Sequence, residues 1–373
     1  MLTLFDFNRI DEYQIEITSY CNAACPQCPR NSLGAGINPH MPLTHLKREA
    51  IDQAFTADLC QRLRQIFFCG SYGDPIMHPE FLDILRDFRR KNPTLWLYFH
   101  TNGGVHNTDY WQEVAKIMNG YGQIDFGIDG LEDTLHTYRK NVKYSKVIEN
   151  AKAFIDAGGR AQWNYIVFEH NEHQVDEAIR ISKEMNFFNI LVRKTGRFFN
   201  HQTLEELPEW PVRNGNPLRV PTNTEYRNQS MLFLPNLKKE YNNIRDYFDS
   251  TEISCDALKG NKVAINAEGL VLPCNFFNHN LYDARFYESN VLPCANELSS
   301  VNGKNQVRSF LEHYGLDNLN INHKSFSEIF DNAMWNDLVD SFSCGLDNGR
   351  LFECAMTCGS KLQKVWDQGG SKV

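Results

Sequence analysis

The first two hundred residues alternate between strand and helix signals, and this alternation constrains the fold more than any other feature. The strand candidates lie at residues 14–19, 65–69, 95–100, 123–128, 162–168 and 189–193. The clearest amphipathic helices between them lie at residues 81–91, 110–118, 145–157 and 174–185. Such alternation favours an α/β fold with a parallel sheet and covering helices. Periodicity alone does not distinguish a partial barrel from a full barrel or a doubly wound sheet.

Three cysteines follow the first strand candidate, in the run Cys21-Asn-Ala-Ala-Cys25-Pro-Gln-Cys28. A cubane 4Fe–4S cluster takes one outside ligand on each iron, usually a cysteine thiolate. Three thiolates on one tight loop would therefore hold a cluster and leave one iron open to a small molecule. Zinc sites usually show paired cysteine or Cys/His sets, and no second pair lies nearby. Ferredoxin loops have a different spacing, which leaves a chance cluster of structural cysteines as the remaining alternative.

The C-x3-C-x2-C spacing resembles the radical S-adenosylmethionine (radical SAM) superfamily. The resemblance implies a partial (β/α)6 TIM-like barrel, with the cysteine loop at the strand ends where barrel chemistry gathers. It also implies that the open iron binds the methionine part of S-adenosylmethionine. An electron from the cluster would then split the sulfonium to a 5′-deoxyadenosyl radical. The expected enzyme abstracts hydrogen from a substrate and needs a reductant such as flavodoxin or ferredoxin.

Later strand ends carry segments similar to other motifs of this superfamily. Residues 69–75 resemble its Gly-Glu-Pro-type segment, residues 100–104 its Thr-Asn-Gly turn, and residues 127–130 its Ser-Ile-Asp-Gly segment. Glycines there would allow a close backbone approach to a ligand. Ordinary turns and satisfied polar residues are the alternatives. The S-adenosylmethionine contacts that the resemblance implies are Gly70, Gly73, Asp74, Thr101, Asn102, Asp129, Asn164 and Arg193, with Asn171 as a further candidate.

Two positions depart from the superfamily pattern. Gly127 stands where a serine commonly contacts S-adenosylmethionine, and Gln27 stands where an aromatic residue usually packs against adenine. We therefore expect adenine to be held in another way, for example by backbone groups around Phe168. The cluster prediction is unaffected, because the three thiolates are intact.

The sequence identifies no catalytic acid, base or radical relay. His78, His100 and Arg193 lie near strand ends, and a structural role fits each of them as well. Cys60 and Cys69 are expected to be buried structural residues rather than metal ligands.

The last third of the chain concentrates six more cysteines: Cys255, Cys274, Cys294, Cys344, Cys354 and Cys358. Residues 262–274 are typical of a β-hairpin with an Asn-Ala-Glu-Gly turn. Cysteines around a hairpin, followed by a close pair, resemble the SPASM/twitch extension of one radical SAM branch. The resemblance implies one auxiliary cluster of the 4Fe–4S type on Cys255, Cys274, Cys354 and Cys358. An all-thiolate zinc site is the alternative, Cys344 could replace one of the close pair, and Cys294 is expected to be a free thiol.

These features divide the chain into a core barrel at residues 1–205, a bridging segment at 206–250 and a SPASM/twitch-like extension at 251–373. A chain of 373 residues, 42% of them hydrophobic, can bury such cores. The net charge of −8 argues against nucleic acid as the main partner. No signal peptide and no run of about 18 apolar residues is visible, so no membrane partner is expected. Eleven cysteines without an export signal favour metal chemistry in a reducing cytoplasm.

Three functions fit these observations. The first is radical oxidation or bond formation on a peptide or protein side chain, assisted by the auxiliary cluster. The second is dehydrogenation or rearrangement of a small metabolite, and the third is a non-catalytic iron–sulfur protein. The intact cysteine triad beside a glycine-rich segment disfavours the third. Many peptide-modifying members carry an N-terminal recognition domain, whereas about twelve residues precede the first strand here, which makes a peptide substrate less expected without excluding it.

Overall fold

A nine-stranded sheet forms the centre of the computed structural model, which describes residues 5–200, 205–228, 239–241, 243–282, 300–301, 304–361 and 371–372. The strand order is β12-β11-β1-β2-β3-β4-β5-β6-β15. The seven strands from β11 to β6 run parallel, while β12 and β15 pair antiparallel at the two edges. Their bounds are β1 Glu12–Ile15, β2 Gln65–Phe68, β3 Trp96–Thr101, β4 Gly122–Gly127, β5 Ala161–Ile166, β6 Asn189–Arg193, β11 Lys262–Ile265, β12 Val271–Leu272 and β15 Ser371–Lys372.

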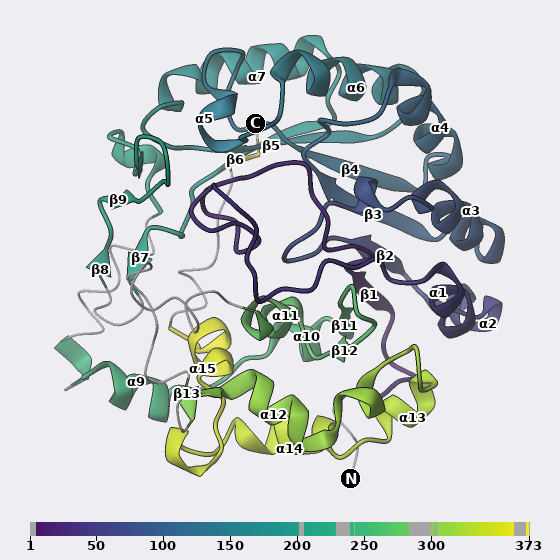
Figure 1. Cartoon of the computed structure of the whole chain (residues 1–373), viewed down its shortest axis with the longest axis vertical. Coiled ribbons are helices and arrows are strands. Elements are labelled where there is room, and N and C mark those ends of the chain that lie inside the picture. Colours follow the sequence, from purple (N-terminus) through teal and green to yellow (C-terminus); the bar gives the residue numbers. More distant parts are fainter. Residues whose placement is uncertain are drawn as a thin grey trace.

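Helices cover the outer side of the sheet, which curves as an arc (Figure 1). In chain order they are α1 Arg48–Ala54, α2 Ala57–Arg62, α3 Phe81–Lys91, α4 Thr108–Met118, α5 Leu135–Tyr138, α6 Tyr144–Asp156 and α7 Val175–Glu184. All six strands and all four helices predicted for this region are present, and the α/β partial-barrel prediction is confirmed.

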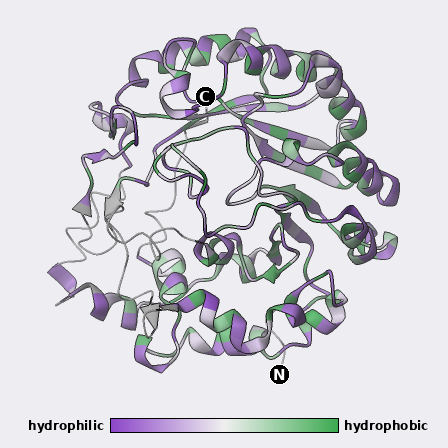
Figure 2. Cartoon of the chain, in the orientation of Figure 1, coloured by the Kyte–Doolittle hydropathy of each residue, from purple (hydrophilic) through white to green (hydrophobic). Residues whose placement is uncertain are grey.

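The helices pack on the sheet through apolar stripes that the sequence spacing produces. In α3, the buried residues Phe81, Ile84, Leu85 and Phe88 recur with the period of one helix face. Phe81 meets Phe68 of β2 edge-on, with ring centroids 5.4 Å apart. Burial of each such side chain contributes about 1.5–3 kcal/mol to stability. Figure 2 shows the same division, with hydrophobic residues toward the sheet and hydrophilic residues on the outer helix surfaces.

The predicted hairpin at residues 262–274 is confirmed, and it extends the core sheet. Strand β11 pairs in parallel with β1, and β12 returns antiparallel to β11. Asn266 N donates to Leu270 O at 3.0 Å, and Gly269 takes the positive φ of 91° that the turn requires. The sheet is therefore continuous across the predicted boundary near residue 251, and the domain bounds stay a prediction.

Helices of the last third of the chain lie beside and below the hairpin in Figure 1. They are α9 Ile244–Ser250, α10 Asp256–Lys259, α11 Asn275–Leu281, α12 Gln306–Tyr314, α13 Phe326–Phe330, α14 Met334–Ser341 and α15 Phe352–Cys358. The short strands β9 Glu209–Trp210 and β10 Leu218–Arg219 lie within the predicted bridging segment. Among the described residues, no helix combines the length and apolarity needed to cross a bilayer.

The first predicted strand runs too far. It ends at Ile15, because the next residues form other contacts. The Glu16 carboxylate accepts hydrogen bonds from Tyr72 N at 2.7 Å and Gly73 N at 2.8 Å, and Thr18 forms an antiparallel bridge with His45. The chain after β1 thereby leaves the ladder and becomes a long loop over the open centre of the arc (Figure 1).

We expect Gly73→Ala to destabilise this junction. A Cβ at Gly73 would lie 1.7 Å from the backbone oxygen of Thr18, so the backbone must shift. Such overpacking costs about 1–3 kcal/mol. Gly215→Ala is the matched control, because its Cβ would meet only side-chain atoms of Val212 and Lys140, the closer at 3.3 Å. Thermal unfolding of the two variants checks the prediction, and equal melting temperatures would contradict it.

Candidate active site

A cavity of about 300 Å³ opens at the carboxyl ends of the parallel strands. Its wall comes from the ends of β3 to β6 and from the segments that follow β1 and β2, because parallel strands present their carboxyl ends at one edge. The wall residues used below are Cys21, Cys25, Cys28, Cys69, Gly70, Gly73, Asp74, His100, Thr101, Asn102, Asp125, Gly127, Tyr138, Arg139, Asn164, Arg193 and Arg197.

Seven of the eight predicted S-adenosylmethionine contacts line this cavity: Gly70, Gly73, Asp74, Thr101, Asn102, Asn164 and Arg193. The eighth, Asp129, lies behind the wall. Its side chain is fully buried and accepts from Ile166 N at 2.7 Å and from Arg139 Nε at 2.6 Å. Asn171 is also structural in its contacts, since it accepts from Phe168 N and donates to the Asp129 carbonyl.

The cysteine loop, residues 21–28, brings its three thiols to one side of the cavity. Cys28 N donates to Cys25 O at 3.0 Å, which closes the turn. Asn102 Nδ2 lies 3.7 Å from Cys21 Sγ, and Arg139 Nη1 lies 3.8 Å from Cys25 Sγ. Burial raises the pKa of Cys25 to about 11, while the Arg139 charge opposes that shift.

This environment fits an iron–sulfur cluster. A buried thiolate needs compensating charge, and iron together with Arg139, Arg197 and Arg30 would supply it, since these arginines act to lower the raised pKa of Cys28. Among the described residues, no three Cys, His, Asp or Glu side chains converge on a single ion position. A cubane does not need such convergence, because its cysteine ligands bind different irons.

The glycine-rich segment, residues 70–74, is fixed against the loop by buried carboxylates. Burial raises the pKa of Glu16 to about 7 and that of Asp74 to about 6, although each accepts several hydrogen bonds. Asp74 accepts from Asn102 N at 2.8 Å and from Thr101 Oγ1 at 3.0 Å. These bonds tie the ends of β2 and β3 together beside the thiols.

The glycine-rich segment also joins the last third of the chain through helix α11. Tyr72 Oη donates to His279 O at 2.8 Å, and Ser71 Oγ donates to Asn275 Oδ1 at 3.2 Å. The Glu16 carboxylate accepts from Asn278 Nδ2 at 2.5 Å. Since α11 begins directly after Cys274, this short helix connects the cavity wall to one of the four cysteines predicted as auxiliary ligands.

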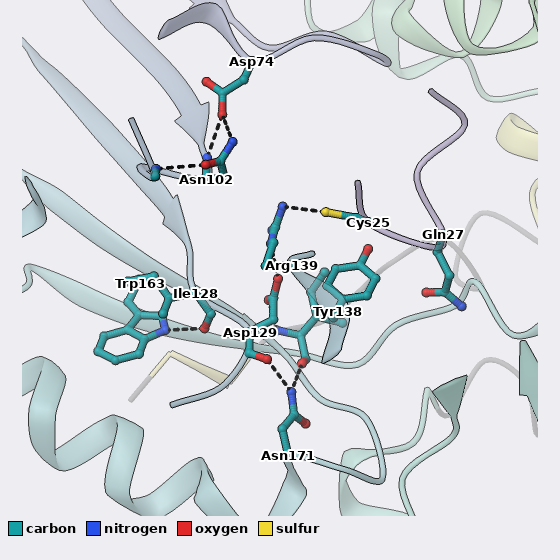
Figure 3. A network of polar contacts seen from close by, with 12 residues as sticks. Cys25, Gln27, Asp74, Asn102, Ile128, Asp129, Tyr138, Arg139, Trp163 and Asn171 are labelled. Atoms are coloured by element: carbon teal, nitrogen blue, oxygen red, sulfur yellow. Dashed lines mark hydrogen bonds and ion pairs between the residues drawn. The ribbon is translucent and has the colours of Figure 1, made fainter. Parts of the chain in front are cut away.

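Arg139 explains why Gly127 departs from the superfamily pattern. A Cβ at residue 127 would lie 2.2 Å from Arg139 Nη2, so a serine would collide with the guanidinium. Figure 3 shows Arg139 between the Asp129 carboxylate and Cys25. The attraction of Asp129 and Cys25 outweighs burial and raises the pKa of Arg139 further. Arg139, Tyr138 and Arg197 were not predicted from the sequence, because no motif marks the segments that carry them.

Gln27 stands apart from this network in Figure 3. Its side chain is buried, and its amide has no hydrogen-bond partner among the described residues. Tyr138 of the cavity wall packs against Phe168 instead, with ring centroids 4.7 Å apart.

Cys69 and His100 also line the cavity, as part of a polar chain that continues to Asp125. Cys69 Sγ lies 3.6 Å from His100 Nδ1, and His100 Nε2 lies 3.2 Å from Asp125 Oδ2. Burial acts to lower the pKa of His100, but Cys69 and Asp125 outweigh it and raise the pKa to about 9. We expected Cys69 to be a buried structural residue. The structure corrects this expectation, because Cys69 is only partly buried and lines the cavity.

The remaining candidates lie elsewhere. Cys60 is buried in α2, where its thiol lies 3.7 Å from Phe55 O. His78 lies 3.0 Å from Leu46 O through Nε2, a structural contact. Cys344 has its thiol 3.6 Å from Asp340 O, and Cys294 lies outside the described residues.

The four cysteines predicted as auxiliary ligands form a second group, the C-terminal cysteine group. Cys354 and Cys358 lie one turn apart on α15, which puts both thiols on one helix face despite the C-x3-C spacing. The thiols of Cys255 and Cys358 are hydrogen-bonded, which lowers the pKa of Cys255 and raises that of Cys358. Burial raises the pKa of Cys354, and the nearby Cys274 and Cys255 raise it further. Their mutual proximity fits ligands that bind different irons of one cluster, which need not converge on a single ion position.

Comparison with known proteins agrees with this geometry. The radical SAM superfamily model matches residues 15–181. A tungsten-containing aldehyde ferredoxin oxidoreductase cofactor-modifying protein of Pyrococcus furiosus is 23% identical over 288 residues, 71% of each chain. Streptococcus suis SuiB bound to S-adenosylmethionine has a TM-score of 0.53 at 16% identity, over 91% of this chain and 71% of that one.

Two further solved structures share the fold. SuiB bound to the precursor peptide SuiA has a TM-score of 0.52 at 15% identity, over 91% of this chain and 70% of that one. The protein anSMEcpe with bound S-adenosylmethionine has a TM-score of 0.52 at 14% identity, over 95% of this chain and 90% of that one. Residues 15–181 therefore match the radical SAM superfamily, and the cysteine loop that follows β1 lies inside this match.

Proposed function

We propose that this protein cleaves S-adenosylmethionine reductively and uses the resulting 5′-deoxyadenosyl radical to abstract hydrogen from a substrate. The observation that carries the proposal is the single cavity lined by the three loop thiols, the glycine-rich segment and Arg193. Cys21, Cys25 and Cys28 would hold a 4Fe–4S cluster, which supplies the electron for the cleavage. A reductant such as flavodoxin or ferredoxin would reduce the cluster again after each cleavage.

The other wall residues would orient S-adenosylmethionine. Gly70 and Gly73 leave the backbone open to its amino group. Arg193 has a planar cation suited to its carboxylate, and its described partner is a neutral amide, Asn164 Oδ1 at 3.3 Å from Nε. Thr101 and Asn102 lie where they can reach the ribose or hold Asp74 in place, and Asp129 acts through Arg139.

The C-terminal cysteine group would hold one auxiliary cluster of the 4Fe–4S type. Its support is the proximity of Cys255, Cys274, Cys354 and Cys358, which come from three separate segments of the chain. Such a cluster accepts an electron from a substrate radical or binds the substrate directly. Zinc on the same thiolates is the alternative.

A peptide or protein side chain is the proposed substrate. One likeness supports it: SuiB has been solved with a precursor peptide. Dehydrogenation or rearrangement of a small metabolite is the second candidate, because the Pyrococcus furiosus relative is by name a cofactor-modifying protein and a cofactor is a small molecule.

The test is anaerobic reconstitution with iron and sulfide, followed by incubation with S-adenosylmethionine and a reductant. We expect slow release of 5′-deoxyadenosine without substrate and faster release with the true substrate. Candidate substrates are peptides encoded beside the gene, especially small ones rich in cysteine or glycine, and polyol metabolites. A reconstituted protein that releases no 5′-deoxyadenosine would overturn the proposal.

Arg193→Ala is expected to weaken S-adenosylmethionine binding while leaving the iron content unchanged. Loss of a charged hydrogen bond of about 1.5–3 kcal/mol corresponds to roughly ten- to hundredfold weaker binding. Equilibrium dialysis with labelled S-adenosylmethionine measures the change. Arg180→Ala is the control, because Arg180 lies exposed on α7 in ion pairs with Glu177 and Glu184. Unchanged affinity in Arg193→Ala would return this residue to a structural role.

A further inference from the structure

One thiol in the cavity has no role in the proposed cluster. Cys69 directly follows β2, and among the described residues that line the cavity it is the one cysteine outside the cysteine loop. The glycine-rich segment begins at the next residue. Cys69 therefore stands beside the proposed S-adenosylmethionine contacts with its sulfur toward the cavity.

His100 is held against this sulfur by a buried carboxylate. Its Nδ1 lies 3.6 Å from Cys69 Sγ, and its Nε2 lies 2.6 Å from Tyr98 Oη and 3.2 Å from Asp125 Oδ2. The His100 side chain is 35% exposed and that of Asp125 is 0% exposed, so the imidazole faces the open side and the carboxylate lies behind it.

Asp125 is itself fixed from several strands. It accepts from Gln162 Nε2 at 2.8 Å, from Asn164 Nδ2 at 2.9 Å and from Gln123 Nε2 at 2.8 Å. Because the carboxylate faces Nε2, that nitrogen carries a proton, and Nδ1 shares a second proton with the Cys69 sulfur. The pair of Cys69 and His100 thus keeps one transferable proton beside the cavity.

We propose that Cys69 donates a hydrogen atom to a carbon radical formed in this cavity, with His100 and Asp125 as its positioning residues. The inference rests on the proposed function, because it needs the 5′-deoxyadenosyl radical. A sulfur–hydrogen bond is weaker than the aliphatic C–H, amide N–H and alcohol O–H bonds of the other wall residues, and only the phenol O–H bonds of Tyr72 and Tyr138 are of comparable strength. The Cys69 variants below separate the thiol from these phenols.

The hydrogen-atom transfer conserves atoms and electrons. A C–H bond forms, the S–H bond breaks, and the unpaired electron moves from carbon to sulfur. If the shared proton resides on His100, the Cys69 thiolate gives the carbon radical an electron and His100 Nδ1 gives it a proton. The products are again a C–H bond and a sulfur radical. The sulfur radical then takes one electron from the one-electron reductant that serves the cluster, and one proton from solvent through His100. A substrate radical quenched in this way gains a solvent-derived hydrogen.

Cleavage of S-adenosylmethionine in D₂O without substrate tests the proposal. Thiol protons exchange with solvent, so Cys69 carries deuterium. Titanium(III) citrate serves as reductant in a thiol-free buffer, because other thiols would also donate deuterium. We expect the reconstituted wild-type protein to give 5′-deoxyadenosine with one deuterium, as seen by mass spectrometry. Cys69→Ala and Cys69→Ser should lose this label with unchanged iron content, and Cys60→Ala should keep it.

The amount and the label of the product separate two failures. Absence of 5′-deoxyadenosine from the wild type overturns the proposed function and this inference with it. Formation of unlabelled 5′-deoxyadenosine by the wild type, or equal labelling by both Cys69 variants, overturns the Cys69 role and leaves the proposed function standing.

Alkylation of the reconstituted protein gives a readout that does not depend on turnover. Iodoacetamide should modify Cys69, as located by peptide mapping, and S-adenosylmethionine should slow the modification by filling the cavity. His100→Gln should slow alkylation near neutral pH, because the thiolate loses its neighbouring imidazolium. The positioning role of His100 would be refuted if neither S-adenosylmethionine nor the His100→Gln substitution changed the rate of Cys69 alkylation.

Discussion

Replacing Cys21, Cys25 and Cys28 together with alanine is expected to remove about four irons per chain and to abolish S-adenosylmethionine cleavage, because a cubane needs its thiolates. The three thiols line one side of the cavity, where Arg139 and Asn102 contact two of them. Iron determination and 5′-deoxyadenosine quantification measure the two effects in the same samples.

Cys60→Ala is the matched control for this triple variant. Its thiol is buried in α2 and does not line the cavity, so iron content and cleavage should remain at the wild-type level. Reductive cleavage by the triple variant would refute the assignment of the loop as the catalytic cluster site.

Replacing Cys354 and Cys358 together with alanine is expected to remove the auxiliary cluster and to stop substrate turnover. At saturating S-adenosylmethionine, uncoupled cleavage should continue, because the cysteine loop is untouched. Metal ligation across separate segments also stabilises a fold. Loss of these ligands on α15 should therefore lower the melting temperature, since α15 packs against α9 and α11. Iron counting, calorimetry and Mössbauer spectroscopy check these effects.

The metal identity is decided in the triple variant of the cysteine loop. This variant should retain about four irons in the C-terminal cysteine group. Zinc in the C-terminal cysteine group of this variant, or the absence of any metal from it, would refute the auxiliary-cluster hypothesis. Cys344→Ala is the control, because the Cys344 thiol contacts Asp340 O rather than the group, and it should keep all its iron.

The fold was largely predictable because its signals are local. Each strand and helix of the core carries its own periodicity, as α3 shows with Phe81, Ile84, Leu85 and Phe88 on one face. The cysteine loop and the glycine-rich segment were predictable for the same reason, since each is a short run of fixed spacing. The parallel pairing of β11 with β1 was not predictable, because it joins residues about 250 positions apart.

The rest of the site depends on contacts between distant loops. Arg139 could not be identified from the sequence, since its place beside Cys25 follows from its ion pair with Asp129. The sequence around Cys69 was misleading about its burial. A cysteine at the end of an apolar strand is usually buried, and only the neighbouring His100 on β3 shows that this one faces the cavity.

The attachment of α11 to the glycine-rich segment makes the two cysteine sites thermodynamically linked. Helix α11 begins directly after Cys274, and its backbone and Asn278 hydrogen-bond to Tyr72 and Glu16 at the cavity. Binding at either site therefore orders the same helix, and the free energy of ordering α11 is spent only once. Linkage is reciprocal. S-adenosylmethionine should therefore bind more tightly when the C-terminal cysteine group is metallated, and that group should bind its metal more tightly, by the same factor, when S-adenosylmethionine is bound.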